Sequence, residues 1–221
     1  KQGVEIELLH FESSPLTPLE SVDKVIKIAS KIARYMPKGQ IKMHICHFAN
    51  LHHMLLENVP DPYIITIMRR KMYDIAEKYA KNNDILVLIN GESIGQVASQ
   101  TLESLSVVEA VTRMPIIRPL ATYDKNDIIK IAHQIDTYET SIIPFEDCCT
   151  VYVPKKPVTK PKLHICEQIE ESFDFKVVQE ETIKGITTFT VYADKEMKLA
   201  NYGFDFNDAY EEWKNDHEPS K

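Results

Sequence analysis

Short hydrophobic runs alternate along this chain with longer segments in which hydrophobic residues recur every three or four positions. The runs predict strands at residues 4–11, 41–48, 84–89 and 114–120. The helical spacing predicts helices at about residues 19–36, 61–82 and 124–135. Because strands alternate with helices, the pattern predicts βαβ crossovers and an α/β fold with a doubly wound parallel sheet.

The run from Asp84 to Ile89 is almost uninterrupted, which is typical of a strand buried on both faces of a parallel sheet. It leads into the turn Asn90-Gly91-Glu92-Ser93, and a helical pattern follows from Leu102. Ligands bind at the carboxyl ends of strands in open α/β sheets, and a helix N-terminus there offers N–H groups to anions. The turn therefore predicts an anion site, with a strand-to-helix turn that binds nothing as the alternative.

The regular alternation ends after residue 137. A loop carries the adjacent Cys148 and Cys149, a proline- and lysine-rich arm follows at 154–162, and a short helix is predicted at 163–172. A strand is one interpretation of residues 187–192. We therefore expect one domain over residues 1–172 and a C-terminal extension over residues 173–221.

The adjacent cysteines are the strongest chemical signal after the glycine turn. They follow a proline in a polar loop and precede four lysines, and nearby cations lower a thiol pKa and favour the reactive thiolate. Such a pair suits a site where one thiol attacks or carries sulfur while a second stands near. Two buried, inert thiols are one alternative. A zinc site is a weaker one, because no CxxC or HxxxH pairing surrounds the pair, and we predict no metal site.

Bulk composition narrows the classes of function. The 221 residues include 43% hydrophobic residues and carry a net charge of −7, which makes the chain a poor stand-alone nucleic-acid binder. No hydrophobic run reaches the ~18 residues of a membrane span, and no signal peptide opens the sequence. We expect a cytoplasmic protein with no membrane partner. The chain enters a strand directly after Lys1-Gln2-Gly3, from which we expect that it has lost an N-terminal portion.

Several segments together resemble the tRNA 4-thiouridine synthetase family, also called tRNA uracil 4-sulfurtransferases or thiamine-biosynthesis sulfurtransferases. The resemblance covers about residues 1–170. Its marks are His10-Phe11, Met68-Arg69-Arg70, Gly91-Glu92-Ser93, Ala98-Ser99-Gln100-Thr101-Leu102-Glu103 and Glu146-Asp147-Cys148-Cys149-Thr150-Val151.

The resemblance implies an adenine-nucleotide α-hydrolase-like (PP-loop) fold and ATP-dependent sulfur transfer to uridine in tRNA, which gives 4-thiouridine. ATP, with Mg²⁺ expected to accompany it, would adenylate O4 of the uridine, and a cysteine persulfide, or sulfide released from it, would displace AMP. The same relay can serve thiazole synthesis for thiamine. The resemblance also implies the site residues. Those for ATP are His10, Phe11, Arg69, Gly91 and Gln100, and sulfur would pass through Cys149, with Cys148 as the alternative or the resolving partner.

The chain departs from the family in two ways. The Ser-Gly-Gly-x-Asp-Ser loop, the first strand and the upstream RNA-binding domains are absent, so we expect this chain alone to hold ATP poorly and to need those domains for tRNA. We expect the resemblance to end at about residue 175, and no rhodanese-like domain is visible, so a cysteine desulfurase would load Cys149. A homodimer is one assembly that the resemblance leaves open.

Two other functions remain as alternatives. One is a different PP-loop enzyme that thiolates tRNA, although such enzymes often use a CxxC motif that is missing here. The other is a sulfur-carrier or metal-binding module built on Cys148 and Cys149 that works without ATP.

Overall fold

The computed structural model describes residues 3–145, 154, 156–197 and 200, and Cys148 and Cys149 lie outside this part of the chain. The chain forms two compact units. Unit 1 comprises residues 1–49, 129–151 and 185–221, and unit 2 comprises residues 50–128 and 152–184. Unit 1 is therefore assembled from three separate stretches of sequence, and each unit is described by itself.

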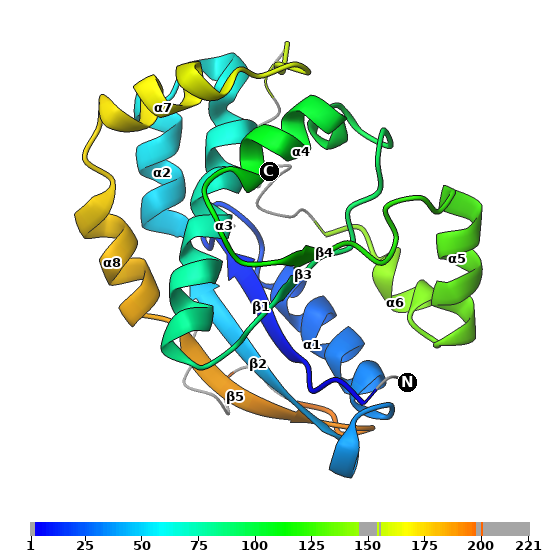
Figure 1. Cartoon of the computed structure of the whole chain (residues 1–221). Coiled ribbons are helices and arrows are strands. Elements are labelled where there is room, and N and C mark those ends of the chain that lie inside the picture. The colour runs from blue at the N-terminus through cyan, green and yellow to red at the C-terminus, as the bar shows by residue number, and fades with distance from the viewer. Residues whose placement is uncertain (1–2, 146–153, 155, 198–199, 201–221) are drawn as a thin grey trace, which may run out of the picture. The chain divides into compact units, whose positions relative to one another are not determined.

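A three-stranded sheet in the order β1-β2-β5 forms the frame of unit 1 (Figure 1). β1 (Glu7–Glu12) and β2 (Gln40–His47) run parallel, which places His10 opposite Ile45. β5 (Thr187–Tyr192) pairs antiparallel with β2. The connection from β1 to β2 passes through α1 (Glu20–Ala33) and the short helix η1 (Pro37–Gly39), and α6 (Tyr138–Ser141) packs on α1.

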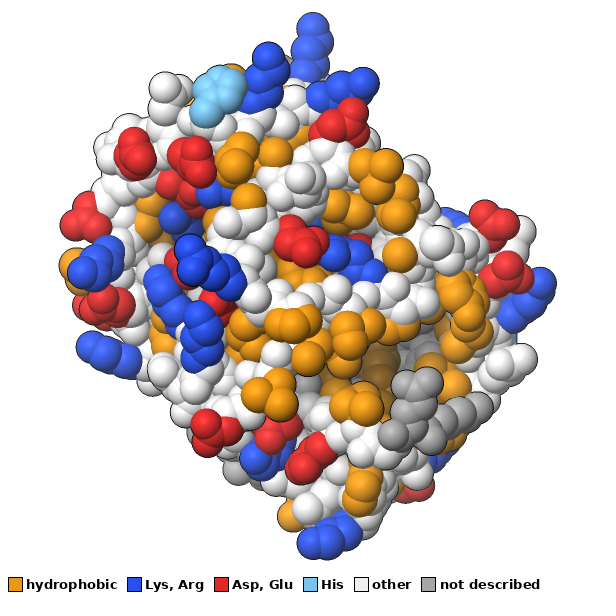
Figure 2. Space-filling model, viewed as in Figure 1, with side chains coloured by type: hydrophobic (Ala, Val, Ile, Leu, Met, Phe, Trp, Pro, Cys, Tyr) orange, Lys and Arg blue, Asp and Glu red, His pale blue; other side chains and the backbone are white. Residues whose placement is uncertain are grey.

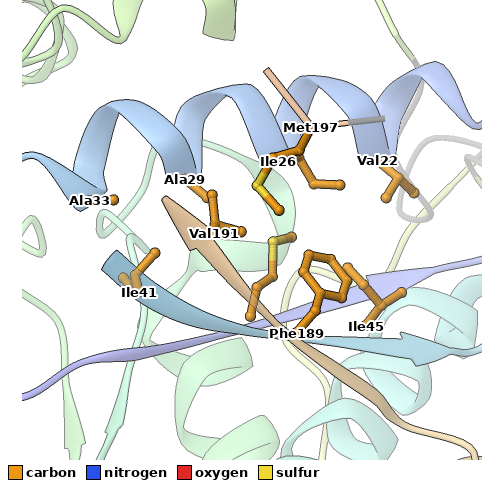
Figure 3. Packing of buried hydrophobic residues seen from close by; sticks show 10 residues of the cluster. Val22, Ile26, Ala29, Ala33, Ile41, Ile45, Phe189, Val191 and Met197 are labelled. Atoms are coloured by element: carbon orange, nitrogen blue, oxygen red, sulfur yellow. The ribbon is translucent and has the colours of Figure 1, made fainter. Parts of the chain in front are cut away.

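The core of unit 1 lies between α1 and its sheet (Figure 3). Hydrophobic residues on α1 recur at helical spacing, and those on β2 alternate so that they share one face. The buried cluster comprises Val22, Ile26, Ala29, Ala33, Ile41, Met43, Ile45, Phe189, Val191 and Met197. Burial of each large side chain contributes about 1.5–3 kcal/mol, so this contact holds α1 and β5 to the parallel pair.

The central element of unit 2 is the long helix α3 (Ile64–Asn82). It contacts α4 (Leu102–Glu109), α7 (Leu163–Glu171), α8 (Lys176–Lys184) and the short strand β3 (Leu88–Ile89). β3 pairs in parallel with β4 (Ile116–Ile117). The other elements are α2 (Ala49–Asn58), η2 (Asp61–Tyr63), η3 (Ala98–Gln100) and α5 (Lys125–Gln134), which begins in unit 2 and ends in unit 1.

Arg70 connects α3 to two of its neighbours. Its buried guanidinium donates to the carbonyl oxygen of Val107 on α4 at 2.6 Å and to Oε2 of Glu170 on α7 at 2.6 and 3.0 Å. Lys71 reaches the other oxygen of Glu170 at 3.1 Å. Because a buried charge is tolerated only when it is paired and hydrogen-bonded, Arg70 serves the packing of unit 2.

The sequence pattern predicts most of these elements. The α/β class with parallel strands is confirmed, and α1, β2, α3, α5, α7 and β5 begin and end within about three residues of the expected positions. α2 and α8 are not predicted by the hydrophobic pattern. Residues 173–221 contribute α8, which contacts α3, and β5, which extends the sheet of unit 1. Among the described residues, no helix has both the length and the hydrophobicity that a membrane span requires.

The prediction that residues 84–89 form a strand buried on both faces is wrong. Only Leu88 and Ile89 adopt strand structure, Leu86 is 81% exposed and Ile89 is 49% exposed. Within the part of the chain that is described, β3 pairs with β4 alone, so strands do not flank it on both sides. Hydrophobic side chains accordingly gather at the surface over the region of β3 and β4 (Figure 2).

Candidate functional site

The carboxyl ends of β3 and β4 bring polar side chains together in unit 2. Asn90 and Glu92 come directly after β3, and Arg118 comes directly after β4. The backbone N–H of Asn90 donates to the carbonyl oxygen of Ile117 at 3.2 Å, which holds the two strand ends side by side. This is the edge of a parallel sheet at which ligands bind.

Glu92 is the centre of a network at this edge. Its carboxylate accepts hydrogen bonds from Nη2 of Arg69, from the hydroxyl of Tyr73 at 3.0 Å, from Nδ2 of Asn90 at 2.9 Å and from Nε of Arg118 at 2.9 Å. The side chains of Arg69, Glu92 and Arg118 are only 11%, 13% and 14% exposed. Charge-assisted bonds with little solvent around them fix both guanidinium groups in place.

Arg69 also connects the glycine turn to the segment around Gln100. Its Nη1 donates to the carbonyl oxygen of Ser99, next to Gln100. The backbone N–H of Gln100 donates to the carbonyl oxygen of Val97 at 2.9 Å. Its carbonyl oxygen accepts a hydrogen bond from the backbone N–H of Gly95, also at 2.9 Å. Three residues that the resemblance assigns to ATP, Arg69, Gly91 and Gln100, therefore lie around one network.

Gly91 leaves its surroundings open. A Cβ at this position would meet only Cδ1 of Leu120 at 3.8 Å, which is an ordinary contact. Packing of the described chain therefore does not require glycine here, and the backbone of the turn can be approached closely from outside. Gly95 differs, because its φ of +77° is a conformation that other residues rarely adopt.

Arg118 is a member of the network that the sequence motifs do not indicate. Besides its bond to Glu92, its Nη1 donates to Oε2 of Glu109 at 2.9 Å. Its remaining nitrogen, Nη2, is buried and has no hydrogen-bond partner among the described residues. An arginine directly after a strand, at the ligand-binding edge, is the signal that could have identified it.

The pKa of Tyr73 reflects the burial and the charges of the network around Glu92. Burial is the main cause that raises its pKa, and the positive charges of Arg118 and Arg69 partly offset that rise. The phenol therefore stays protonated near neutral pH and can donate its hydrogen bond to Glu92.

His10 and Phe11 belong to unit 1, where β1 ends. The ring of Phe11 packs edge-to-face on Phe48, with centroids 5.6 Å apart. The next residue, Glu12, is buried, and its carboxylate accepts hydrogen bonds from Nδ1 of His47 and from the backbone N–H of Ser14. The carboxyl ends of β1 and β2 are thus tied together in unit 1, as those of β3 and β4 are in unit 2.

The described cysteines are poor candidates for sulfur transfer. Cys46 and Cys166 are completely buried. Burial, helped by the negative charge of Glu12, raises the pKa of Cys46 to about 12, and burial raises the pKa of Cys166 to about 11. Both groups are therefore neutral thiols at neutral pH, whereas the thiolate is the nucleophile.

We expect iodoacetamide to modify Cys46 and Cys166 of the folded chain at least about 100-fold more slowly than an ordinary thiol of pKa ~8.5 near pH 8. Because their folded pKa values are raised, the thiolate fraction stays low until the pH approaches about 11 for Cys166 and about 12 for Cys46. Mass spectrometry of peptides after timed labelling measures the rates. The urea-unfolded chain is the control, in which these two thiols should react at the ordinary rate. Equal rates in the folded and unfolded chain would contradict the prediction.

Metal ligands do not gather in the described part of the chain. No group of three or more His, Cys, Asp or Glu side chains there is arranged to hold a metal ion.

Comparisons with known proteins point to one family. The family model described as "Thiamine biosynthesis protein (ThiI)" matches residues 1–175. A protein of Acholeplasma laidlawii described as "Probable tRNA sulfurtransferase" is 53% identical over 209 residues, which are 95% of this chain and 51% of that protein. A protein of Halothermothrix orenii with the same description is 48% identical over 177 residues, which are 80% of this chain and 44% of that protein.

A solved structure is similar as well. It is described as "Crystal structure of a 4-thiouridine synthetase - RNA complex with bound ATP". The TM-score is 0.81 and the identity 37%, over 86% of this chain and 50% of that chain. This chain thus spans about half the length of the relatives it matches. The similarity confirms the predicted fold class, a PP-loop type of α/β fold, and the resemblance on which it rested.

Proposed function

Because this chain belongs to the thiamine biosynthesis protein (ThiI) family, we propose that it is the ATP-binding and sulfur-transferring part of a tRNA sulfurtransferase that makes 4-thiouridine. The observation that carries the proposal is the network centred on Glu92. It gathers Arg69, Gly91 and the segment around Gln100 at the carboxyl edge of two parallel strands.

ATP is the first substrate in this proposal. Arg69 would pair with its phosphates, because a guanidinium fork matches phosphate geometry, and the open backbone at Gly91 would admit them. Gln100 would complete this part of the site, and His10 and Phe11 of unit 1 would meet the adenine nucleotide at the end of β1. Mg²⁺ would accompany the nucleotide.

Sulfur transfer follows activation of the uridine. Adenylation of O4 releases pyrophosphate and turns a poor leaving oxygen into a good one. The outer sulfur of the Cys149 persulfide would displace AMP and bond to C4, and a second thiol, for which Cys148 is the candidate, would then attack the Cys149 sulfur, releasing 4-thiouridine and forming a disulfide. In the other order, the same attack would release sulfide, which would displace AMP. The raised pKa values of Cys46 and Cys166 favour Cys149 for this role, with Cys148 as the alternative or the resolving partner. A cysteine desulfurase would load the persulfide.

The other partners extend beyond this chain. The neighbouring solved structure is named as a complex with RNA, which supports tRNA as the second substrate. We propose that tRNA is positioned by the part of the relatives that this chain does not span. We also propose that the protein supplies sulfur for the thiazole of thiamine, that it is located in the cytoplasm and that it forms a homodimer.

A chimera tests the proposed function. In the Acholeplasma laidlawii relative, the matched half is replaced by this chain, and the purified chimera receives tRNA, ATP, cysteine and a cysteine desulfurase. We expect ATP-dependent 4-thiouridine, measured by mass spectrometry of digested tRNA. A folded chimera that makes none would overturn the proposal. Persulfide on Cys148 or Cys149 that passes to an acceptor without ATP would favour the sulfur-carrier function instead.

A further inference from the structure

One buried nitrogen of Arg118 forms no hydrogen bond within the described part of the chain. Its Nε and Nη1 are bound to Glu92 and Glu109, each at 2.9 Å, whereas Nη2 is buried without a hydrogen-bond partner in the described part of the chain. A buried donor that forms no hydrogen bond costs free energy, and its retention calls for a physical reason. An acceptor oxygen supplied from outside the chain would satisfy this donor.

The charges around Arg118 favour an anionic acceptor. Arg69 and Arg118 share one carboxylate of low exposure, that of Glu92. The second acidic partner, Glu109, is 44% exposed, so solvent weakens its interaction with Arg118. Among the described residues, Arg118 therefore has no well-shielded carboxylate of its own, and an anion from outside the chain would complete its pairing.

The geometry favours phosphate in particular. Arg69 comes from α3 and Arg118 from the end of β4, and Glu92 accepts a hydrogen bond from each, so both forks are fixed before a ligand arrives. Guanidinium groups bind phosphate through paired N–H donors, and fixing them in advance lowers the entropy cost of binding. The open backbone at Gly91 adjoins the same network.

We propose that Arg118 binds a phosphate oxygen of the nucleotide's polyphosphate, and that Arg69 and Arg118 form a two-arginine clamp positioned by Glu92. This inference rests on the proposed function, which supplies ATP as the ligand. Arg118 is the binding residue that it adds, and Glu92 is a positioning residue.

Titration calorimetry of the purified chimera with inorganic pyrophosphate and with ATP tests the clamp, because this chain alone is expected to hold ATP poorly. Arg118→Gln is expected to weaken binding of pyrophosphate about 10- to 100-fold, because it removes hydrogen bonds to a charged group. ATP should weaken in parallel. The matched control is Arg113→Gln, which removes the same charge from an exposed arginine of the same unit and should change either affinity by less than about 2-fold.

A second variant and two folding measurements distinguish a loss of binding from a loss of folding. Arg118→Lys keeps a positive charge near Glu92 but replaces the fork by one ammonium group, and it should also weaken pyrophosphate binding, by about 10-fold. Circular dichroism and thermal melting establish that each variant is folded. Unchanged pyrophosphate affinity in both folded variants of the chimera, or no binding of pyrophosphate by the unaltered and folded chimera, would overturn the inference.

The two proposals fail separately. If the chimera makes 4-thiouridine but the Arg118 variants bind pyrophosphate normally, only the clamp is wrong. If pyrophosphate binding depends on Arg118 but a folded chimera makes no 4-thiouridine, the anion site stands and the sulfurtransferase function falls.

Discussion

Replacement of Glu92 by alanine is expected to lower the free energy of unfolding by about 3–5 kcal/mol, a large share of the roughly 5–15 kcal/mol that holds a typical domain folded. The carboxylate is bound by Arg69 and Arg118, which are 11% and 14% exposed. Its removal would leave both guanidinium groups desolvated without their shared counter-charge, while Tyr73 and Asn90 would lose their common acceptor. Urea unfolding followed by circular dichroism measures the change.

Two further variants separate the charge of Glu92 from its packing. Glu92→Gln keeps one acceptor oxygen and most of the volume, so its loss should lie between those of the alanine variant and the unaltered chain. Glu109→Ala removes the 44% exposed partner of Arg118 and should cost less than about 1 kcal/mol. If Glu92→Ala cost no more than Glu109→Ala, the network would not stabilise the fold as described.

Replacement of Cys149 by alanine in the chimera should reduce formation of 4-thiouridine by roughly 1000-fold or more, since loss of a covalent nucleophile removes the main reaction path. ATP binding should be retained, because the residues proposed to bind ATP, among them Arg69, Gly91 and Gln100, are unchanged in this variant. The amount of 4-thiouridine per tRNA under initial-rate conditions is the readout, and ATP affinity of the same preparation shows whether the nucleotide site is intact.

Matched cysteine variants define what that result means. Cys166→Ala removes a buried thiol whose pKa is raised to about 11, and it should leave the rate within a few-fold of the parent. If Cys148 is the resolving thiol, Cys148→Ala should still accept the persulfide on Cys149, and added dithiothreitol should restore release of 4-thiouridine. Full activity of Cys149→Ala combined with an inactive Cys148→Ala would exchange the two roles.

Several elements could be predicted because their hydrophobic residues follow the period of the structure. The stripe on α1 at Val22, Ile26, Ala29 and Ala33 is an example, and all four are buried. α8 shows why other elements escape prediction. Its buried residues, Gln179 and Thr182, are polar, and Gln179 is held by a hydrogen bond to Asp74 on α3 at 2.5 Å. A helix that is anchored by polar contacts carries no hydrophobic period.

The prediction of a buried strand at residues 84–89 is wrong for the opposite reason, because hydrophobic residues are present there but are not all buried. Hydrophobicity reports what a residue can bury, whereas burial depends on which neighbours are present, and Leu86 is largely exposed here.

The candidate site was only partly visible in the sequence. Arg69, Gly91 and Gln100 lie in motifs that could be recognised, and the structure places them around one network. Tyr73 lies one helical turn after Arg69 on α3, so local spacing relates these two. Glu109 and Arg118 belong to the network through tertiary contacts that the motifs do not indicate. His10 and Phe11 were predicted from the same resemblance and lie at the end of β1 in unit 1, while Cys148 and Cys149 lie outside the described residues.

The antiparallel pairing of β5 with β2 has a consequence for the order in which the protein is made. Residues 40–45 pair with residues 187–192, and the covering side chains Phe189 and Val191 come from the late segment. A ribosome delivers the whole of unit 2, residues 50–128 and 152–184, before it delivers β5. Contacts between such distant positions form slowly, and hydrophobic surface that waits for its partner is prone to aggregate. β1 and β2 therefore wait through the synthesis of unit 2 before β5 can pair with β2, and chaperone demand during translation should be concentrated on them.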